Sequence, residues 1–539
     1  MDGAINITGD ANISAVNGNG LTYAARVFSN GKIKMGDYGT DDGATRVVKG
    51  HILSQNSGDI TLSLTNNASS LTGRVVEADG TTHLTAINGA TWNVAGNSRV
   101  TNFYTGNNAI IDMTYLPGNF QTLKIDNLEG SGGSLFKLKT DIEGDASDTI
   151  KVTNGTGTNR ILVHSVGAEP QRERMNTYLA EVASGDASFV LENRARLVDA
   201  GTYVYDLHNE TNANTGVGTG WYLQRTEREI LSPTAEAVVT LTGIASSYSM
   251  WHSQLADLRK RMGEIRYDEK KDGFWFRAFG QKDKLDGLED TRFSQDVYGA
   301  SAGFDRLVKQ DANNDWLFGV KGQYTKADQD LHGLWGGSGK NESFGLAAYA
   351  TWKHTDGWYA DGVLSWDRYH QKISDHMLDG TPVSGSYNRY ALGASIEAGR
   401  HFKLANDVFI EPQLQLSYFW LKGKNFTMDN GLAVDTKNAD VVTGRAGLVL
   451  GKKWEISKNR YVQPYVKGGV IHEFTGDDKT IINADNVFKG DISGTRPYYG
   501  LGIDWKFNDQ ARLYGEFERQ DGDHVRSLWN VNVGLRVSF

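Results

Sequence analysis

The carboxyl-terminal half of the chain is dominated by residues that alternate between apolar and polar from Gly273 onward. In the last stretch the apolar alternate positions are Trp529, Val531, Val533, Leu535, Val537 and Phe539. The positions between them are polar or small, apart from the single charge of Arg536. Successive side chains of a strand point to opposite faces, so this alternation predicts strands with one apolar face. Aromatic residues near the strand ends are typical of the lipid-facing wall of a transmembrane β-barrel.

The alternation predicts about twelve strands within residues 271–539, most of them reaching the roughly 10 residues that a tilted strand needs to span a bilayer. Connection lengths support this prediction. Connections after even-numbered strands are short, as at 354–356 and 508–510, whereas those after odd-numbered strands are mostly longer, as at 327–341 and 423–438. Outer-membrane barrels have short periplasmic turns and long outer loops. Both ends of the predicted barrel would then lie on the periplasmic side.

The period of the pattern changes just before the barrel. Ser232-Pro233 is a helix-start signal, and Leu255, Leu258, Met262 and Ile265 then recur at helical spacing. We therefore expect a helix within 231–270, about 35 residues and ~50 Å long. Its middle, 245–249, is small and polar, which suits a water-lined lumen better than lipid. A helix running through the barrel would place the preceding chain outside the cell. The alternative is a periplasmic domain with the helix packed elsewhere.

Residues 1–230 contain short β-rich runs punctuated by Gly, Asn, Asp and Ser about every ten residues. Because apolar positions are sparse, we expect 1–140 to form a right-handed β-helix, in which each rung buries only its inner face. Residues 141–230 gain larger apolar side chains, for example at 203–205 and 221–223. This second segment is predicted to cap the open end of the solenoid. The expected fold class is therefore all-β apart from the one helix.

Composition agrees with a β-rich membrane protein. Glycine is 63 of 539 residues, aromatics are 11%, proline is only 7, and no apolar run approaches the ~20 residues of a spanning helix. Cysteine is absent, and the net charge of −9 comes with no basic stripe, so a nucleic-acid partner is not expected. The first residues lack the features of a signal peptide. We therefore expect the sequence to begin partway through a longer precursor.

Motifs for catalysis or metal binding are missing from the sequence. The His residues show no HExxH spacing, no Gly-x-Ser-x-Gly elbow occurs, and the phosphate-loop-like run 336–340 lacks its first glycine and its hydroxyl residue. We predict no catalytic, cofactor or metal site. Glu516 and Glu518 are expected to face the lumen, where they could lie opposite Arg259, Lys260 and Arg261 of the helix. The three basic residues could equally form a solvated helix end.

Several segments, in this order along the chain, resemble the autotransporter family. Residues 144–152, 198–205 and 220–223 look like the pertactin-type stem and autochaperone region, and 89–94 looks like a rung of diffuse-adherence-type adhesins. The run 258–266 resembles the basic end of the family's lumenal helix, and 272–280 its first barrel strand. The final residues resemble the family's barrel-assembly signal.

This resemblance implies an outer-membrane translocator that carries its own passenger to the cell surface, where the passenger is an adhesin with an unknown host or cell-surface ligand. It implies outer-membrane lipid, the barrel-assembly machinery and periplasmic chaperones as partners, and no cofactor. The residues implied for the assembly signal are Asn532, Gly534, Val537 and Phe539. Those implied for the lumenal helix are Leu258, Arg259, Lys260, Arg261, Met262 and Gly263.

One departure from the family concerns passenger release. Serine-protease-type members cut themselves within the helix at paired asparagines, and alignment on 260–263 places Ala256 and Asp257 there instead. Asparagine cyclisation is therefore not expected, and the passenger either stays attached or is cut by another route. Two other function classes remain open: an autotransporter whose further N-terminal passenger is a protease or esterase, and a soluble, secreted β-rich binding protein such as a lectin.

Overall fold

The computed structural model describes residues 3–166, 169–170, 177–211, 216–255, 258–259, 272–457 and 459–539. The chain forms two compact units. One contains residues 1–232 together with 376–381, and the other contains 233–375 and 382–539. Among the helices in the described ranges, none is both long and apolar enough to cross a membrane.

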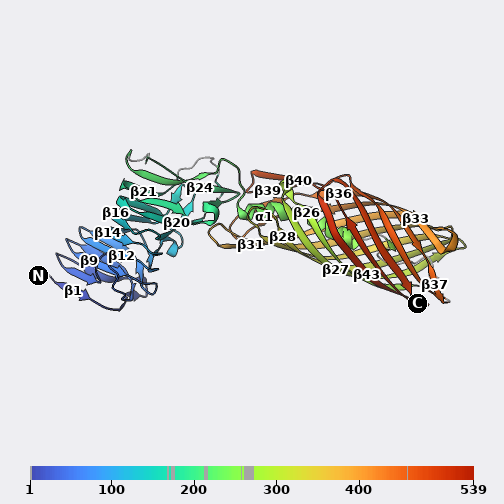
Figure 1. The fold of residues 1–539 in the computed structure, drawn as a ribbon, viewed down its shortest axis with the longest axis horizontal. Helices are drawn as coiled ribbons and strands as arrows, with labels where there is room; N and C mark the ends of the chain where they lie inside the picture. The colour runs from blue at the N-terminus through green and yellow to red at the C-terminus, as the bar shows by residue number, and fades with distance from the viewer. Residues whose placement is uncertain are drawn as a thin grey trace. The chain divides into compact units, whose positions relative to one another are not determined.

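The first unit is a parallel β-helix, whose rungs run from blue to green in Figure 1. One sheet contains, in spatial order, β1 (Ala4–Ile7), β6 (Lys32–Met35), β9 (Asp59–Leu64), β12 (Thr81–Ala86), β14 (Ser98–Thr105), β16 (Thr122–Gly130), β19 (Thr149–Thr156) and β21 (Thr177–Gly185). A second sheet contains β2 (Ala11–Ser14), β7 (Arg46–Lys49), β10 (Ser70–Gly73), β13 (Thr91–Val94), β15 (Ile110–Asp112), β17 (Leu135–Asp141), β20 (Thr158–Ser165) and β22 (Ser188–Leu191). A third, short sheet contains β5 (Tyr23–Val27), β8 (His51–Gln55) and β11 (Val75–Ala78). The solenoid predicted from the sequence is confirmed.

Columns of buried side chains hold the rungs together. In the first sheet Leu62, Leu84, Phe103 and Leu128 occupy paired positions on successive strands, and each is at most 1% exposed. Burying an apolar side chain of this size contributes roughly 1.5–3 kcal/mol. Because each rung buries its apolar face only against its neighbours, sparse apolar residues are sufficient, as the sequence pattern indicated.

The sheet changes direction at the end of this unit. Strand β21 pairs antiparallel with β25 (Thr219–Arg225), which pairs with β24 (Tyr203–Thr211) and, through it, with β23 (Val198–Ala200). Trp221 of β25 packs edge-on against Phe189, whose ring contacts Phe136 in the same way, with centroid distances of 5.3 and 6.0 Å. These antiparallel strands cover the edge that β21 would otherwise expose.

A buried carboxylate joins two turns of the β-helix. The side chain of Asp148 is fully buried and accepts the backbone N–H groups of Gln121 at 2.7 Å and Lys139 at 2.9 Å. Burial raises the pKa of Asp148 to about 6, although these two hydrogen bonds favour the charged form. The folded chain therefore holds a proton here more tightly than the unfolded chain does.

The second unit is the barrel. Within the described residues, twelve strands close on themselves, with β26 paired to β43 and β31 paired to β33. The strands are β26 (Gly273–Asp286), β27 (Arg292–Gln310), β28 (Asn314–Leu331), β29 (Ser338–His354), β30 (Trp358–His376), β31 (Pro382–Arg400), β33 (Val408–Leu421), β36 (Ala439–Lys452), β38 (Arg460–Glu473), β41 (Gly494–Lys506), β42 (Ala511–Gln520) and β43 (Val525–Ser538). The predicted barrel is confirmed. Several strands extend further toward the outer loops than expected, because their polar outer ends look like loop in the sequence.

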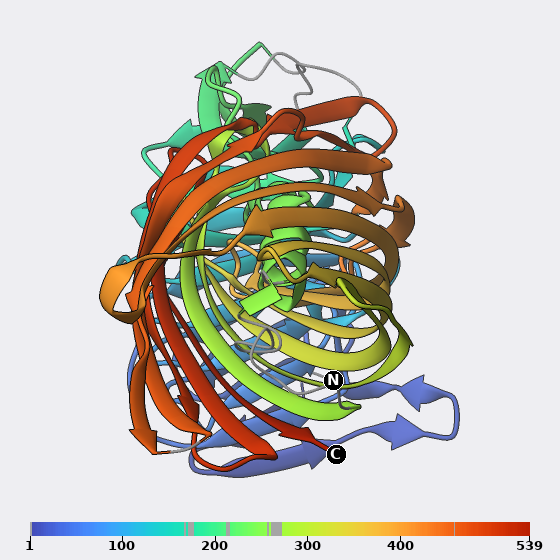
Figure 2. The ribbon, with the colours of Figure 1, turned by 90° about the vertical axis from the view of Figure 1, so that its right-hand side faces the viewer.

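Two helices precede the first barrel strand: α1 (Pro233–Leu241) and α2 (Ala245–Leu255). The sequence predicted a single helix within 231–270, and the structure separates α1 from α2 at residues 242–244. Figure 2 shows this green helical segment inside the ring of barrel strands. Most of its side chains are buried, and hydrogen bonds connect it to strands on several sides of the lumen.

Two outer loops form a small sheet of their own. It contains β34 (Lys424–Thr427), β35 (Ala433–Thr436), β39 (Asp477–Ile482) and β40 (Asn486–Asp491), in that spatial order. Strands β35 and β39 belong to different loops and meet at the pair Val434 and Ile482. The sequence analysis predicted the first of these segments, 423–438, as a simple connection. The strands were missed because they are stabilised by pairing between loops that are distant in sequence.

Candidate functional site

The lumen of the barrel is lined by polar side chains that match the polar face of α2. Ser249 Oγ donates to Asp283 at 2.6 Å, and Ser246 Oγ donates to Gln295 at 2.9 Å. Further along α2, Gln254 donates to Thr325 of β28 at 2.9 Å and to Ser343 of β29 at 3.0 Å. Buried polar groups require such partners. The small polar residues 245–249 therefore belong to a helix that fills a polar lumen.

Aromatic packing fixes the remaining side of α2. The Trp251 ring lies 5.1 Å from the Phe419 ring between centroids, and its indole N–H donates to Ser365 at 2.9 Å. A Cβ added at Gly393 would meet the Trp251 ring at 2.3 Å, so this wall position has room only for glycine. The Tyr248 hydroxyl donates to Glu473 at 2.7 Å.

Two charged residues satisfy the backbone groups that are freed where α1 ends and α2 begins. Arg389 of β31 donates to the carbonyl of Thr242 at 2.8 Å, and it also donates to the carbonyls of Lys422 and Lys437 in an outer loop. The Asp478 carboxylate of β39 accepts the N–H of Ile244. A break in a buried helix leaves unpaired N–H and C=O groups, and these contacts supply their partners. We call Arg389 and Asp478 the helix-break clamp.

The N-terminal end of α1 lies among the outer loops. Glu236 accepts the N–H groups of Leu334 and Trp335, each at 2.9 Å, and Thr234 Oγ1 accepts from Asn430 at 3.0 Å. These loop residues follow strands whose ends face outward. The helical segment therefore begins at the end of the barrel where the longer loops lie.

The other end of the helical segment lies near the short turns. Leu258 is buried, and its N–H donates to Glu397 at 3.1 Å. Arg259 pairs with Glu411 at 3.0 Å, and its guanidinium lies 4.9 Å from the centre of the Tyr465 ring. Of the other residues that the family resemblance implied here, Lys260, Arg261, Met262, Gly263, Ala256 and Asp257 lie outside the described residues.

An ionic cluster lines the lumen along strands β36, β38 and β42. Lys467 pairs with Glu516 at 2.5 Å and with Glu518 at 2.7 Å, and Arg445 pairs with Glu518 at 2.9 Å. The expectation that both glutamates face the lumen is confirmed. The sequence did not identify Lys467 or Arg445 as partners, because they lie on strands whose pairing is not evident from local pattern. Buried charges of this kind persist only when they are paired.

A second buried ion pair connects the last strand to the second. Arg536 of β43 donates to both carboxylate oxygens of Asp305 of β27, at 2.7 Å each, across the intervening β26. A Cβ added at Gly273 of β26 would lie 2.2 Å from the Arg536 guanidinium. Glycine at that position leaves space for the bridge.

The residues implied for the assembly signal lie along β43. Asn532 is buried on the lumenal side, and the Gly534 backbone lies under the Tyr514 ring, where an added Cβ would be 2.1 Å from the ring. Val537 points outward and is half-buried, while Phe539 is 60% exposed and stacks on Phe304 with centroids 6.2 Å apart. The predicted alternation of the last strand is therefore present.

The outside of the barrel carries a continuous apolar belt. Among its exposed side chains are Phe276, Phe318, Val320, Leu346, Leu364, Leu392, Leu414, Leu416, Leu448, Leu501, Val531 and Val533. Aromatic residues flank this belt, with Trp316 near Trp352 at the end of the short turns and Trp366 stacked on Tyr390 at the outer end. Such an arrangement matches the hydrocarbon layer and its two interfaces.

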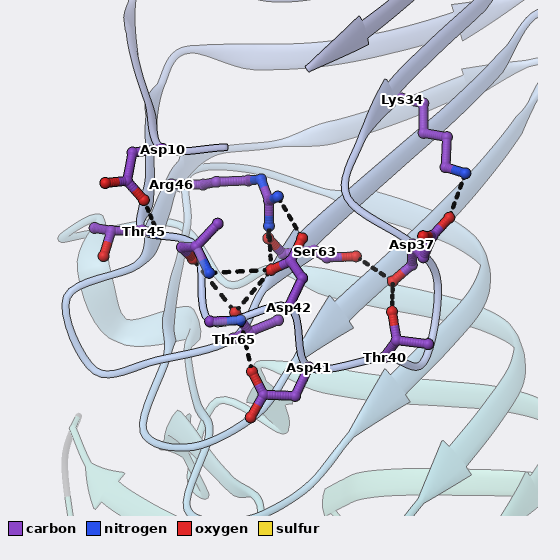
Figure 3. Close-up of polar contacts among 12 residues, drawn as sticks. Asp10, Lys34, Asp37, Thr40, Asp41, Asp42, Thr45, Arg46, Ser63 and Thr65 are labelled. Atoms are coloured by element: carbon purple, nitrogen blue, oxygen red, sulfur yellow. Dashed lines mark hydrogen bonds and ion pairs between the residues drawn. The ribbon is translucent and has the colours of Figure 1, made fainter. Parts of the chain in front are cut away.

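A loop in the first unit, residues 36–45, is fastened by several polar contacts (Figure 3). The fully buried Arg46 donates to Asp42 at 2.5 Å and to the carbonyl of Ser63 at 3.0 Å. The hydrogen bond from Arg46 holds the pKa of Asp42 below its usual range. Asp10 accepts the N–H of Thr45 at 2.7 Å. These partners come from different rungs, so the hydrogen bonds of the acidic loop connect neighbouring rungs of the β-helix.

Two aspartates and a histidine meet in outer loops of the barrel. Asp286, Asp290 and His524 could each direct one atom to a common point, and in the described part of the chain they are the group with that geometry. Asp286 and His524 already pair at 3.0 Å, which ordinary hydrogen bonding explains. Asp290 is exposed and the other two residues are half-buried, and a surface group of this kind assigns no metal site.

Comparison with known proteins matches two parts of the chain to family models. Residues 274–518 match the autotransporter beta-domain, and residues 104–225 match pertactin. The pertactin autotransporter of Bordetella bronchiseptica is 29% identical over 496 residues, covering 84% of this chain and 53% of that protein. The autotransporter adhesin/invasin TibA of Escherichia coli O78:H11 is 25% identical over 552 residues, covering 91% and 54% respectively.

A solved structure, the beta domain of the Bordetella autotransporter BrkA, is 29% identical and covers 50% of this chain and 100% of that chain, with a TM-score of 0.43. The chain thus spans about half the length of these two curated relatives.

Proposed function

We propose, from the premise that this chain is an autotransporter with a pertactin-type stem and a translocator barrel, that the barrel and its lumenal helix carry residues 1–230 to the cell surface. Proteins of this family lie in the outer membrane with the passenger outside. The observation that carries the proposal is the course of the helical segment through the lumen. It begins among the outer loops at Glu236 and reaches the inner end at Arg259.

Protease treatment of intact cells tests this proposal. Cells expressing the full-length precursor are treated with proteinase K, and blots detect residues 1–230 and the barrel separately. The expected result is loss of the passenger while the barrel stays as a protected fragment. A periplasmic marker that resists digestion controls for cell lysis. If the passenger resists digestion until the outer membrane is opened, it is periplasmic and the proposal is wrong.

The last strand supports a proposal about assembly. In the family, the barrel-assembly machinery recognises a C-terminal signal. Val537 and Phe539 occupy outward positions of the last strand, and Phe539 is 60% exposed. We expect Phe539→Ser to reduce the amount of assembled barrel in membranes while synthesis is unchanged. The unassembled chain should then accumulate in complexes with periplasmic chaperones. Normal assembly of this variant would contradict a role for Phe539 in the signal.

We further propose that the passenger is a non-enzymatic adhesin. The names of the relatives, pertactin and adhesin/invasin, support this class. In this proposal 1–140 is the β-helix fragment, 141–230 the stem that folds first and templates the rungs, 231–270 the lumenal linker, and 271–539 the barrel. The alternative is that the passenger is an enzyme, with its catalytic domain in the half of such proteins that this chain does not cover.

Cell adhesion separates these alternatives. Bacteria displaying the full-length precursor are compared with bacteria displaying only the barrel, on cultured epithelial cells and on bare plastic. An adhesin gives more bound bacteria that depend on the passenger. If adhesion is unchanged while the secreted material hydrolyses a protein or ester substrate, the enzymatic alternative is correct.

A further inference from the structure

A group of basic residues points outward at the outer end of the barrel. Arg368, His370 and Lys372 occupy alternate positions of β30, and all three are exposed. Lys340 of the neighbouring strand β29 is exposed and lies directly opposite Lys372. Alternate residues of a strand share one face, and here that face is the outside of the barrel. We call Lys340, Arg368 and Lys372 the rim cations.

The rim cations begin where the apolar belt ends. On β30 the outward positions before Arg368 are Leu364 and Trp366, which are 67% and 40% exposed. Trp366 stacks on Tyr390 of the adjacent β31, with ring centroids 5.9 Å apart. Two residues of strand span roughly 7 Å, so the first cation follows the aromatic pair by about that distance. Outward of such an aromatic belt lie the lipid headgroups.

One amide side chain orients the first of these cations. The Oδ1 atom of Asn388 accepts from the Arg368 guanidinium at 3.2 Å and is 3.0 Å from His370 Nδ1. Both contacts involve outward-facing positions on β30 and β31. The guanidinium is therefore held on the lipid-facing surface while its remaining N–H groups stay available.

Nearby carboxylates form no ion pair with the rim cations, within the residues that the structure describes. Asp328 is opposite Lys340 in register, but it pairs with Lys326 at 3.2 Å. Glu342 lies opposite His370 and Lys326. Within the residues that the structure describes, ion pairs of 4 Å or less involve neither Lys340, Arg368 nor Lys372. By contrast, Lys282, another cation on the outside of the barrel, pairs with Asp296.

We propose that the rim cations bind the phosphate groups of an anionic glycolipid in the outer leaflet. Guanidinium offers a planar fork that fits phosphate oxygens, and ammonium groups add point charges on either side. Basic clusters beside an apolar membrane surface attract anionic headgroups. This inference rests on the barrel lying in an outer membrane, and it does not depend on what the passenger does.

The test measures binding of lipid A, with two phosphates, to the purified full chain in neutral detergent. Native mass spectrometry counts bound lipid across a titration, with dephosphorylated lipid A in parallel. The variant is Lys340→Gln, Arg368→Gln and Lys372→Gln together. The matched control removes three exposed cations at the inner rim, by Arg306→Gln, Lys309→Gln and Arg460→Gln. Heat-modifiable gel migration confirms that each barrel is folded.

The expected result is a dissociation constant at least tenfold weaker for the rim variant, with the inner-rim control unchanged and the dephosphorylated lipid bound weakly by all proteins. Should the triple variant fail to fold, Arg368→Gln alone serves the same comparison. Equal affinity of the rim variant and the control, or equal binding of both lipids, would overturn the proposal. Surface display of the passenger is measured separately, so its loss and the loss of lipid binding are distinguishable.

Discussion

The guanidinium of Arg536 donates to both carboxylate oxygens of Asp305, at 2.7 Å each, although the two residues lie on strands separated by β26. Both side chains are almost fully buried in the lumen. The pair therefore connects the C-terminal strand to the second strand on the far side of the point where the barrel closes. Breaking a buried ion pair leaves one charge buried without its partner, and this lowers the stability of the folded barrel.

Replacing Arg536 with Met is expected to destabilise the barrel by about 3–5 kcal/mol, because the Asp305 carboxylate remains buried and unpaired. The temperature at which heat-modifiable migration is lost should fall. The double variant Arg536→Met, Asp305→Leu removes both charges and is expected to recover most of the loss. If the single and double variants lose heat-modifiable migration at the same temperature, the unpaired Asp305 charge is not the cause of the destabilisation.

A methyl group at position 534 should disturb closure of the barrel. The added Cβ of Gly534→Ala would lie 2.1 Å from the Tyr514 ring, so the ring must move at a cost of roughly 1–3 kcal/mol. We expect less folded barrel in membrane fractions, and Tyr514→Leu should restore it. Gly515→Ala is the control, since its Cβ would meet its nearest neighbour at 3.6 Å. Equal yields for both alanine variants would refute the steric argument.

The effect of an introduced charge on barrel stability is expected to depend on whether its position lies in the lipid-facing belt. Leu364 lies between the aromatic positions Trp358 and Trp366 of β30 and is 67% exposed, and Leu334 in an outer loop is 62% exposed. Leu364→Arg should cost about 1–3 kcal/mol, because it places a cation in hydrocarbon between the midplane and the outer interface. Leu334→Arg should be neutral. The check is the urea midpoint of folding into vesicles, and similar midpoints for the two variants would place Leu364 outside the hydrocarbon.

Removing one residue of the helix-break clamp is expected to open the chain locally, where α1 meets α2. Arg389→Met removes the donor to three backbone carbonyls, and each unsatisfied buried group costs about 1–3 kcal/mol. Hydrogen–deuterium exchange within 242–248 should become faster while the barrel strands stay protected. Arg292→Met, at an arginine that is 74% exposed, is the matched control. Unchanged exchange within 242–248 would show that Arg389 does not hold the break.

Asp148 predicts a pH dependence of passenger stability. Its folded pKa of about 6 lies above its unfolded value, so the folded state binds the proton more tightly. The contribution of this group is therefore most favourable below the unfolded pKa and declines as the pH rises through about 6, by at most about 3 kcal/mol.

Urea-induced unfolding of the passenger in the full chain, followed by pulse proteolysis from pH 4 to 8, measures this effect. The stability of the wild type relative to Asp148→Asn should fall over that window. Asp186→Asn, at an exposed position, removes the same charge and serves as the control. A difference between wild type and Asp148→Asn that stays constant with pH would contradict the prediction.

The local pattern of apolar and polar residues was sufficient to predict those strands and helices that bury one face. The alternation through Trp529 and Phe539 predicted the last strand, and the change of period at Pro233 predicted the start of the helical segment. Lumenal orientation of Glu516 and Glu518 also followed from alternation. In each case neighbouring residues alone carry the physical signal.

Contacts between distant segments could not be predicted in this way. The break between α1 and α2 was not predicted, because Arg389 and Asp478, which bond to Thr242 and Ile244, lie far along the chain. Likewise Arg259 was recognised as basic, while its partner Glu411 depends on strand order around the barrel. The small outer sheet was missed for the same reason. Register between strands fixes these pairs, and no local period encodes it.

The outer sheet has a practical consequence for the engineering of surface loops. Because Val434 pairs with Ile482, the loops that carry β35 and β39 share backbone hydrogen bonds and order each other. A peptide inserted into either loop for display would disturb its partner and, through Asp478, the start of α2. These two loops are therefore unsuitable as independent insertion points.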